Sequence, residues 1–264
     1  MSSADDGAPT SDRGRVRLRL VSYNVRDLRD DRDAVAHVLR ALRCDVACLQ
    51  EVPRRWFQQH GVSRLARETG LRRACGGRAS GGTAIFVGRR LDVAAAGAFR
   101  LPVRAPWTRT RGAAVVTVSL DGVRLVAASV HLPLGPGDRV THARIVRARL
   151  ATLAPGTAGP TPLVIAGDLN EPPGGPAWEV LGAGLTDVAQ DATDVGAPAP
   201  TFTARRPARR IDAVLVGPGV LATSVRVPGS PDDAGLPDLS LADLQSASDH
   251  LPVVVDVLLG AGPG

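Results

Sequence analysis

The clearest structural signal in the sequence lies at residues 113–132, where two β-rich runs are joined by Asp121-Gly122. An Asp-Gly pair between two such runs is a strong signal for a type I′ turn, and it predicts a tight antiparallel hairpin. Any sheet that contains this hairpin must be antiparallel at least in part.

Helical segments alternate with further strand-like runs on both sides of the hairpin. Residues 31–43, 55–69 and 138–153 have the apolar spacing of amphipathic helices. Strands are expected at residues 16–25, 45–52, 83–88, 162–170, 210–217, 221–227 and 251–259. Strands joined both by a hairpin and by helical crossovers indicate an α/β domain with mixed sheets.

Length and composition favour one large domain. The chain has 264 residues, 44% of them hydrophobic, and a single domain is predicted over residues 16–260 after a disordered polar tail at 1–15. No apolar run reaches the roughly 18 residues that a membrane span needs. The three cysteines and the lack of an apolar leader predict reduced thiols in a cytoplasmic protein. The sequence does not determine the oligomeric state, and a monomer is the working expectation.

Charge is distributed unevenly along the chain. Residues 211–264 carry a net charge of −6 and the remaining residues carry +12, with arginine as the only basic residue type. A basic body suits a phosphate-bearing substrate. By contrast, a predicted loop insertion at residues 228–247 has no basic residue, and its acids would repel a long polyanion if they border the cleft. These acids are Asp232, Asp233, Asp238 and Asp243.

Polar and titratable side chains follow several of the predicted strands. They are Asn24, Gln50, Glu51, His131, Asp168, Asn170, Asp249 and His250. Taken singly, each has an ordinary explanation: a turn residue, a helix-capping acid or a packed histidine. Because strand ends bring distant parts of a chain together, five such junctions in one domain favour a shared active site.

With these junctions, the sequence resembles the endonuclease/exonuclease/phosphatase superfamily of metal-dependent phosphoesterases, from about Val16 to Leu258. The resemblance is carried, in order, by SYNV (22–25), LQEV (49–52), GGTAIF (81–86), RGAAVVTV (111–118), SVHLPL (129–134), GDLNEPP (167–173), RRIDAVLV (209–216) and SDHLPV (248–253). It implies a DNase I-like four-layer α/β sandwich. In this fold two mixed β-sheets pack face to face with helices outside, and the site lies at one end.

The resemblance also implies a divalent metal and its ligands. Glu51 would supply the metal carboxylate with Asn24 beside it, and Asp249 would be a metal ligand or a structural acid. Asp27 matches an auxiliary metal acid of some relatives. Mg²⁺ is the expected ion, with Mn²⁺ as a substitute, because a hard cation takes oxygen ligands and completes its shell with water and substrate phosphate.

Further roles carry over to the residues that handle water and phosphate. Asp168 would orient or deprotonate the attacking water, and Asn170 would donate hydrogen bonds to the phosphoryl group. Asp212 and His250 would form an acid–imidazole pair, in which the carboxylate raises the pKa of the imidazole. His131 would bind the phosphate or the leaving group. Sequence alone does not decide which group is the general base.

Three arginines are candidates for phosphate binding. Arg111 opens a matching motif; it either braces the site and contacts phosphate, or it is an ordinary strand-end arginine. Arg54 follows the predicted metal glutamate, where nucleases of this family often place a DNA-contacting base. Arg209 belongs to ARRPARR (204–210), a basic run just ahead of the acid of the predicted pair.

Together these features predict Mg²⁺-dependent hydrolysis of phosphodiesters, with nucleic acid as the favoured partner. Aromatic residues make up only 3% of the chain, which counts against base stacking on single strands. The alternative is a phosphatase or diesterase for a small phosphorylated metabolite or lipid headgroup, with the acidic loop as a lid. A catalytically silent nucleic-acid-binding module is a third hypothesis, against which the complete set of site residues speaks.

Overall fold

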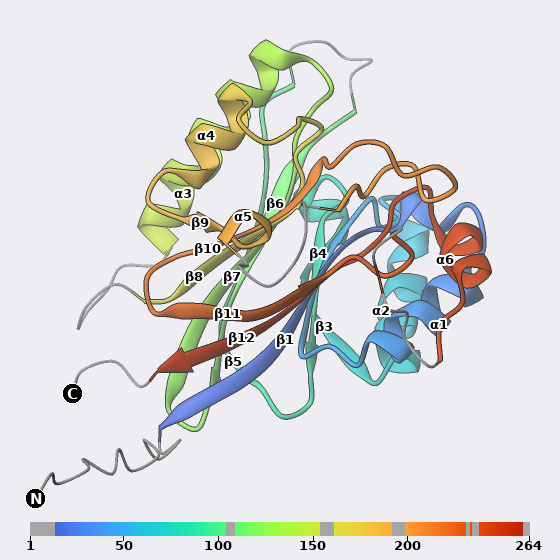
Figure 1. Cartoon of the computed structure of the whole chain (residues 1–264), viewed down its shortest axis with the longest axis horizontal. Coiled ribbons are helices and arrows are strands. Elements are labelled where there is room, and N and C mark those ends of the chain that lie inside the picture. Colours follow the sequence, from blue (N-terminus) through green and yellow to red (C-terminus); the bar gives the residue numbers. More distant parts are fainter. Residues whose placement is uncertain are drawn as a thin grey trace, which may run out of the picture.

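Two six-stranded β-sheets pack face to face at the centre of the molecule (Figure 1). The computed structural model describes residues 14–103, 109–153, 161–191, 199–230, 233 and 238–260. The first sheet has the order β11 (Val220–Arg226), β12 (Val253–Gly260), β1 (Arg15–Asn24), β2 (Val46–Gln50), β4 (Ala84–Gly88) and β3 (Leu71–Gly76). The second has the order β5 (Asp92–Arg100), β6 (Gly112–Leu120), β7 (Val123–His131), β8 (Leu163–Asp168), β10 (Asp212–Val216) and β9 (Thr186–Asp187).

Both sheets are mixed. β1 and β2 pair in parallel in the first sheet, as do β7 and β8 in the second, while the other ladders are antiparallel. The parallel pairs follow from crossover helices, and the antiparallel pair β6–β7 forms at the expected Asp-Gly turn. The α/β sandwich with mixed sheets is therefore confirmed.

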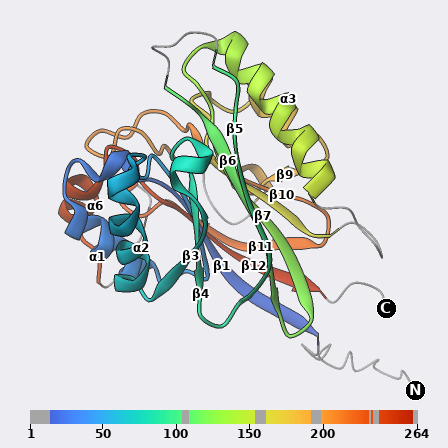
Figure 2. The same cartoon turned by 180° about the vertical axis from the view of Figure 1, so that it is seen from behind.

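Helices cover the outer face of each sheet (Figures 1 and 2). The first sheet is covered by α1 (Arg32–Leu42), α2 (Gln59–Glu68) and α6 (Leu241–Ala247), and the second by α3 (Pro136–Leu153) and α4 (Pro176–Gly182). The shorter elements are α5 (Val188–Asp191) and the 3₁₀ turns η1 (Arg26–Leu28), η2 (Trp56–Gln58) and η3 (Gly77–Ser80). Within the described ranges, no helix is both long enough and apolar enough to cross a lipid bilayer.

Strand alternation divides the apolar side chains of the second sheet between two cores. On β8, Val164 and Ala166 point into the core between the sheets, and Ile165 points out toward α3 and α4. On β10, Val214 and Leu215 divide in the same way. Because both faces are covered, these strands are continuous apolar runs and not alternating ones.

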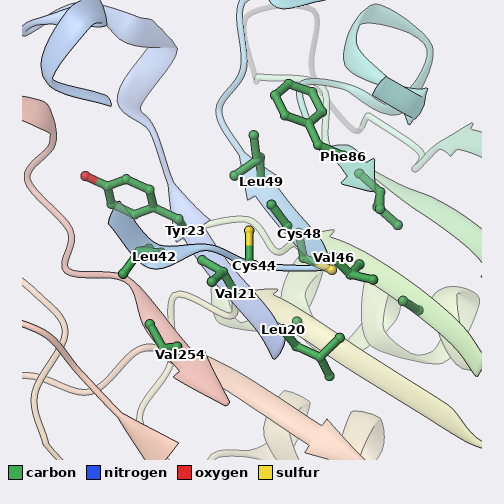
Figure 3. Close-up of a cluster of buried hydrophobic side chains, with 14 of the residues drawn as sticks. Leu20, Val21, Tyr23, Leu42, Cys44, Val46, Cys48, Leu49, Phe86 and Val254 are labelled. Atoms are coloured by element: carbon green, nitrogen blue, oxygen red, sulfur yellow. The ribbon is translucent and has the colours of Figure 1, made fainter. Parts of the chain in front are cut away.

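The core on the two faces of the first sheet packs with few aromatic rings. Around β1, β2 and β4 it is built from aliphatic side chains with Phe86 and Tyr23 (Figure 3). Cys44 and Cys48 belong to this cluster as buried free thiols, and burial raises the pKa of Cys44 to about 12. Thiols held protonated in this way pack as small hydrophobic groups.

The structure differs from expectation at several elements. β3, β5 and α4 have no counterpart among the elements expected from sequence, and the helix expected at 55–69 is divided into η2 and α2. Of the tail expected at 1–15, residues 1–13 lie outside the described part of the chain. Arg15 already pairs with Gly260 in the β1–β12 ladder, because hydrogen bonding to β12 extends the strand to that point.

The segment expected as an acidic loop, 228–247, ends in a helix. Ser240 caps α6, since its Oγ accepts a hydrogen bond from the Asp243 backbone N–H at 3.2 Å. Asp238 lies 3.5 Å from Arg43 at the C-terminal end of α1, the end of that helix farther from Asn24. Asp233 lies 3.0 Å from Arg226, and Asp232 lies outside the described residues. The described acids therefore make ordinary structural contacts.

Candidate active site

Strands β7, β8 and β10 of the second sheet have their terminal residues side by side at one end of the sheet. His131 is opposite Asp168 in the parallel β7–β8 ladder, and Asp212 is opposite Asp168 in the antiparallel β8–β10 ladder. Directly paired residues on neighbouring strands point to the same face of a sheet. Sheet register therefore places an imidazole and two carboxylates next to one another, although they come from three separate parts of the chain.

The first sheet supplies the facing wall. Asn24 ends β1, Glu51 follows β2, and His250 lies just ahead of β12. The Asn24 amide donates to Asp168 Oδ2 at 2.9 Å across the gap between the sheets. Ser248 Oγ in turn donates to the Asn24 carbonyl at 2.6 Å, which ties the start of the SDHLPV segment to the end of β1.

Asp168 is almost completely buried and lies at the centre of the cluster. Its Oδ1 accepts from the Asn170 backbone N–H at 2.9 Å, and its Oδ2 lies 3.3 Å from His131 Nε2. Burial, together with the negative charge of Asp212, raises the pKa of Asp168 to about 6. The carboxylate is thus held in one orientation by donors from both sheets.

The expected acid–imidazole pair is present in the geometry. Asp212 Oδ2 lies 2.9 Å from His250 Nδ1, and His250 Nε2 lies 3.7 Å from Asp168 Oδ2. Burial alone would lower the pKa of His250, but the charge and hydrogen bond of Asp212, with a further contribution from Asp168, outweigh it and raise the pKa to about 9. The Phe202 ring packs 4.9 Å from the imidazole and shields this pair from solvent.

His131 occupies a different electrostatic environment. Arg111 Nη1 lies 3.2 Å from its Nδ1, and Asn170 Nδ2 lies 3.1 Å from its Nε2. Burial first, and then the Arg111 charge, lower the pKa of His131 well below its ordinary value. The site therefore contains one imidazole that favours its neutral form and one that favours its protonated form.

Two site residues have a left-handed backbone. Glu51 and Asn170 both have φ of 51°, directly beyond the ends of β2 and β8. Residues other than glycine adopt this conformation at an energetic cost and often do so at functional sites. Here it turns each side chain off the strand toward the cluster.

Glu51 lies among cationic side chains. Its carboxylate oxygens are 3.4 Å from Arg109 and 3.7 Å from Arg111. Arg109 also lies 3.5 Å from Asp27, whose backbone N–H donates to the Glu51 carbonyl. Arg111 is buried and contacts both Glu51 and His131, so it is not a surface arginine at a strand end.

The donor set of the site fits a hard divalent cation. Ligand atoms of Asp168, Asp212 and His250 all lie within 4.8 Å of one another. Buried Asp212 Oδ1 has no hydrogen-bond partner among the described residues. Glu51 and Asn24 add oxygens from the facing sheet. A set rich in carboxylate and amide oxygens suits Mg²⁺ or Mn²⁺ better than soft metals.

An open pocket adjoins this cluster at Glu51, and we call it the arginine pocket. Its volume is about 550 Å³. Asp27, Gln58, Gly81 and Thr110 contribute to its wall, but most of the lining is arginine: Arg29, Arg54, Arg55, Arg78, Arg100 and Arg109. A cavity with this excess of positive charge is suited to bind anions.

The structure brings together most of the residues expected from sequence. The common cluster contains Asn24, Glu51, Arg111, His131, Asp168, Asn170, Asp212 and His250. Arg54 lines the arginine pocket. Arg209 meets the cluster through the Phe202 ring, over which its guanidinium lies at 4.8 Å. The Asp249 carboxylate pairs with Arg26 at 3.2 Å.

Two residues of the site were not expected from sequence. Arg109 contacts Glu51, and Phe202 packs on His250. Arg109 had a usable signal, because it lies two residues before Arg111 in an extended segment, where alternate side chains share a side. Phe202 reaches His250 only through an isolated β-bridge between two loops, which has no local sequence signal.

Comparison with known proteins places this arrangement in a wider group. The family model "Endonuclease/Exonuclease/phosphatase family" matches residues 21–250. No curated protein matches the chain. Among solved structures, the fold is similar to the mannosyl-6-phosphatase Bt3783 of Bacteroides thetaiotaomicron, with 20% identity, 91% of this chain and 99% of that chain covered, and a TM-score of 0.73.

Two further solved structures share the fold. One is ANGEL2, a 2′,3′-cyclic phosphatase in complex with adenosine-2′,3′-vanadate, at 16% identity, with 93% and 96% of the two chains covered and a TM-score of 0.70. The other is a humanized D. rerio TDP2, at 19% identity, with 91% and 98% covered and a TM-score of 0.63. Members of the matched family are phosphoesterase hydrolases and generally depend on a divalent metal. Since its model covers most of the sequence, the chain belongs to the endonuclease/exonuclease/phosphatase family.

Proposed function

We propose that the chain hydrolyses phosphodiester bonds in nucleic acid with Mg²⁺ as cofactor. The observation that carries this proposal is the junction at Glu51, where the carboxylate–imidazole cluster meets the arginine pocket. The cluster supports hydrolysis at one phosphate. The pocket supports the binding of other phosphates on the same molecule, as a polymeric substrate would present them.

Glu51 and Asn24 are the residues that would hold the metal. The Glu51 carboxylate oxygens lie 3.4 Å from Arg109, 3.7 Å from Arg111 and 4.0 Å from His131. The side-chain oxygen Oδ1 of Asn24 accepts a hydrogen bond from the Arg26 backbone N–H at 3.0 Å. Asp249 is a less suitable ligand, because its carboxylate already pairs with Arg26. When bound, the ion would polarise a phosphoryl oxygen and offset the charge on the leaving oxygen, and Mn²⁺ would substitute for Mg²⁺.

The attacking water would be held between the two sheets. Asp168 Oδ2 and His250 Nε2 face each other at 3.7 Å, and Asp212 orients the imidazole through its other nitrogen. A water bound there would be oriented by both groups and would transfer its proton to one of them as it attacks phosphorus. Asn170 and His131 would donate hydrogen bonds to the phosphoryl oxygens or the leaving group.

Nicking of supercoiled plasmid tests the proposal. The unsubstituted protein should convert plasmid to open circles with Mg²⁺ and not with EDTA. Replacing one member of the general acid–base machinery should cost about 10²–10⁴-fold in rate, so His250→Ala should fall by that amount. His37→Ala, a substitution on α1 away from the cluster, is the matched control and should retain the rate.

The outcomes separate the two candidate substrate classes. Nicking that needs both metal and His250 would support the nucleic-acid proposal. Equal nicking by His250→Ala would contradict the assignment of the site. Metal-dependent release of phosphate from hexose 6-phosphates, without action on DNA or RNA, would favour a small-metabolite phosphatase. That is the activity named for the similar Bacteroides structure.

A further inference from the structure

Two aromatic side chains project into solvent beside the active site. Trp56 and Phe57 are 76% and 55% exposed, and their rings pack edge to face with centroids 5.8 Å apart. Aromatic residues are scarce in this chain, and the described rings of Tyr23, Phe86 and Trp178 are buried. Packing in the core therefore does not account for this exposed pair, and exposed apolar patches of this kind often mark binding surfaces.

The chain path places the pair at the rim of the arginine pocket. Trp56 and Phe57 form η2 together with Gln58, and the residues on either side of them, Arg55 and Gln58, line the pocket. The Arg55 guanidinium lies 5.9 Å over the Phe57 ring, a cation–π contact that joins the rim to the lining. Aromatic surface and positive charge thus form one continuous feature.

The pocket borders the carboxylate–imidazole cluster through Arg109. Arg109 lines it and lies 3.4 Å from Glu51. A substrate phosphate bound in the pocket would therefore belong to a nucleotide close to the scissile bond.

From this arrangement we infer that the arginine pocket and the Trp56–Phe57 rim bind an unpaired nucleic-acid segment next to the scissile phosphate. Its phosphates lie against the arginines and a base stacks on the aromatic rim. The inference rests on the proposed function and adds the strand form of the substrate. Base faces are accessible for stacking only in single strands, since a duplex buries them.

An anionic membrane surface is the rival occupant for a feature with arginines and aromatics. A bilayer presents a broad surface, whereas here the arginines line a cavity, and one of them, Arg109, lies 3.4 Å from Glu51. A flexible chain of phosphates can enter such a cavity, and a lipid surface can reach only its rim. The observations therefore favour a nucleic-acid strand.

Binding to labelled oligonucleotides tests the inference without cleavage. His250→Ala in the presence of Mg²⁺ provides the background, and fluorescence anisotropy gives the dissociation constant. An oligothymidine of about 12 nucleotides should bind at least tenfold more tightly than a duplex of equal length, and Trp56→Ala or Phe57→Ala should weaken its binding by about 5- to 100-fold. Leu221→Ala removes an exposed side chain on β11 and is the matched control, with no expected change.

Salt dependence tests the arginine part of the inference. Each phosphate contact in single strands contributes about −0.7 to the slope of log binding constant against log salt. Arg55→Ala and Arg78→Ala should each make the slope shallower by about that amount. Arg64→Ala removes an exposed arginine on α2 that does not line the pocket, and it should leave the slope unchanged.

Several outcomes would overturn the inference. Equal affinity for single and double strands, or affinity unaffected by Trp56→Ala and Phe57→Ala, would show that bases do not stack on the aromatic rim. Aromatic-dependent binding to vesicles of anionic phospholipid, with none to oligothymidine, would assign the surface to a membrane.

Failure of the proposed function would be seen separately. If the unsubstituted protein nicks plasmid but Trp56→Ala and Phe57→Ala do not change its affinity for oligothymidine, the inference fails and the proposed function stands. If the protein does not cleave but single-strand binding depends on the pair, the function fails and the binding site stands.

Discussion

At the scale of single residues, the Asp168 carboxylate joins the two halves of the site. It accepts a hydrogen bond from Asn24 of the first sheet and has His131 and Asp212 beside it on the second. His250 completes the cluster from the segment before β12. A buried carboxylate next to a second carboxylate is electrostatically unfavourable, and hydrogen-bond donors together with the His250 imidazolium offset this cost.

The Asp212–His250 pair should make stability depend on pH in the metal-free protein. The folded-state pKa of His250 is raised to about 9, above its ordinary 6.5, so its contribution is fully present below pH 6.5 and is lost as pH rises through 9. The free energy of unfolding should therefore fall over that range by at most about 3 kcal/mol. Urea denaturation in EDTA at a series of pH values measures this.

Two variants make the test specific. Asp212→Asn removes the main partner charge and should abolish most of the fall. Asp256→Asn breaks an ion pair with Arg19, which joins β12 to β1 in the first sheet. It should lower stability by a similar amount at every pH in this range, because the pKa of Asp256 is already low. An identical pH slope in Asp212→Asn and the unsubstituted protein would contradict the pairing.

At the scale of secondary-structure elements, β8 must lie unusually close to β7 for the site to form. Gly167 directly precedes Asp168, and a Cβ added to it would overlap the Val130 carbonyl group. The glycine is required by this close approach, because its backbone does not have a positive φ. Gly167 pairs with Val130, and the next pair in this ladder is Asp168 with His131, so the close packing keeps these two side chains next to each other.

Gly167→Ala should therefore be destabilising. Overpacking in a closed core costs about 1–3 kcal/mol, and here the obstacle is backbone, so a loss near about 3 kcal/mol is expected in urea denaturation. Gly97→Ala on β5 is the matched control, since nothing lies within 4 Å of its added Cβ. It should be neutral or slightly stabilising, because alanine restricts the unfolded chain. Equal stability of the two variants would contradict the close approach.

At the scale of the whole molecule, part of the excess positive charge found in the sequence is gathered in one place on the fold. Six of the arginines line one pocket beside the site. The described acids of the 228–247 segment have other partners: Asp238 pairs with Arg43, Asp233 pairs with Arg226, and Asp243 takes part in the capping box of α6. The positive potential is thus concentrated where a polyanion would meet the catalytic cluster.

Ionic strength should therefore affect large and small substrates differently. Between about 50 and 200 mM salt, kcat/KM for an oligonucleotide should fall about 10- to 100-fold, as expected for release of counterions at several phosphate contacts. For bis(p-nitrophenyl) phosphate, which has a single phosphate, it should change less than about twofold. Parallel losses for both substrates would show that the pocket does not contribute to binding.

Local sequence determined most of the secondary structure and the identity of the clustered polar residues. The Asp121-Gly122 turn and the apolar periodicities predicted the hairpin and most strands and helices, because turn conformation and side-chain alternation depend on neighbouring residues. The polar residues at strand ends predicted the cluster around Asp168, and the structure brings them together. β5 was not predicted, because its alanine- and glycine-rich run has a weak pattern and the strand forms by pairing with β6.

Only the tertiary structure decided what adjoins that cluster. The arginine pocket collects side chains from residues 27–110, and its shape depends on how loops from both sheets pack. The low aromatic content counted against binding of single strands, but the fold exposes Trp56 and Phe57 at the rim of that pocket. Exposure and proximity follow from long-range packing, which no local pattern encodes, so the sequence could predict the clustered polar groups and not the pocket and aromatic rim beside them.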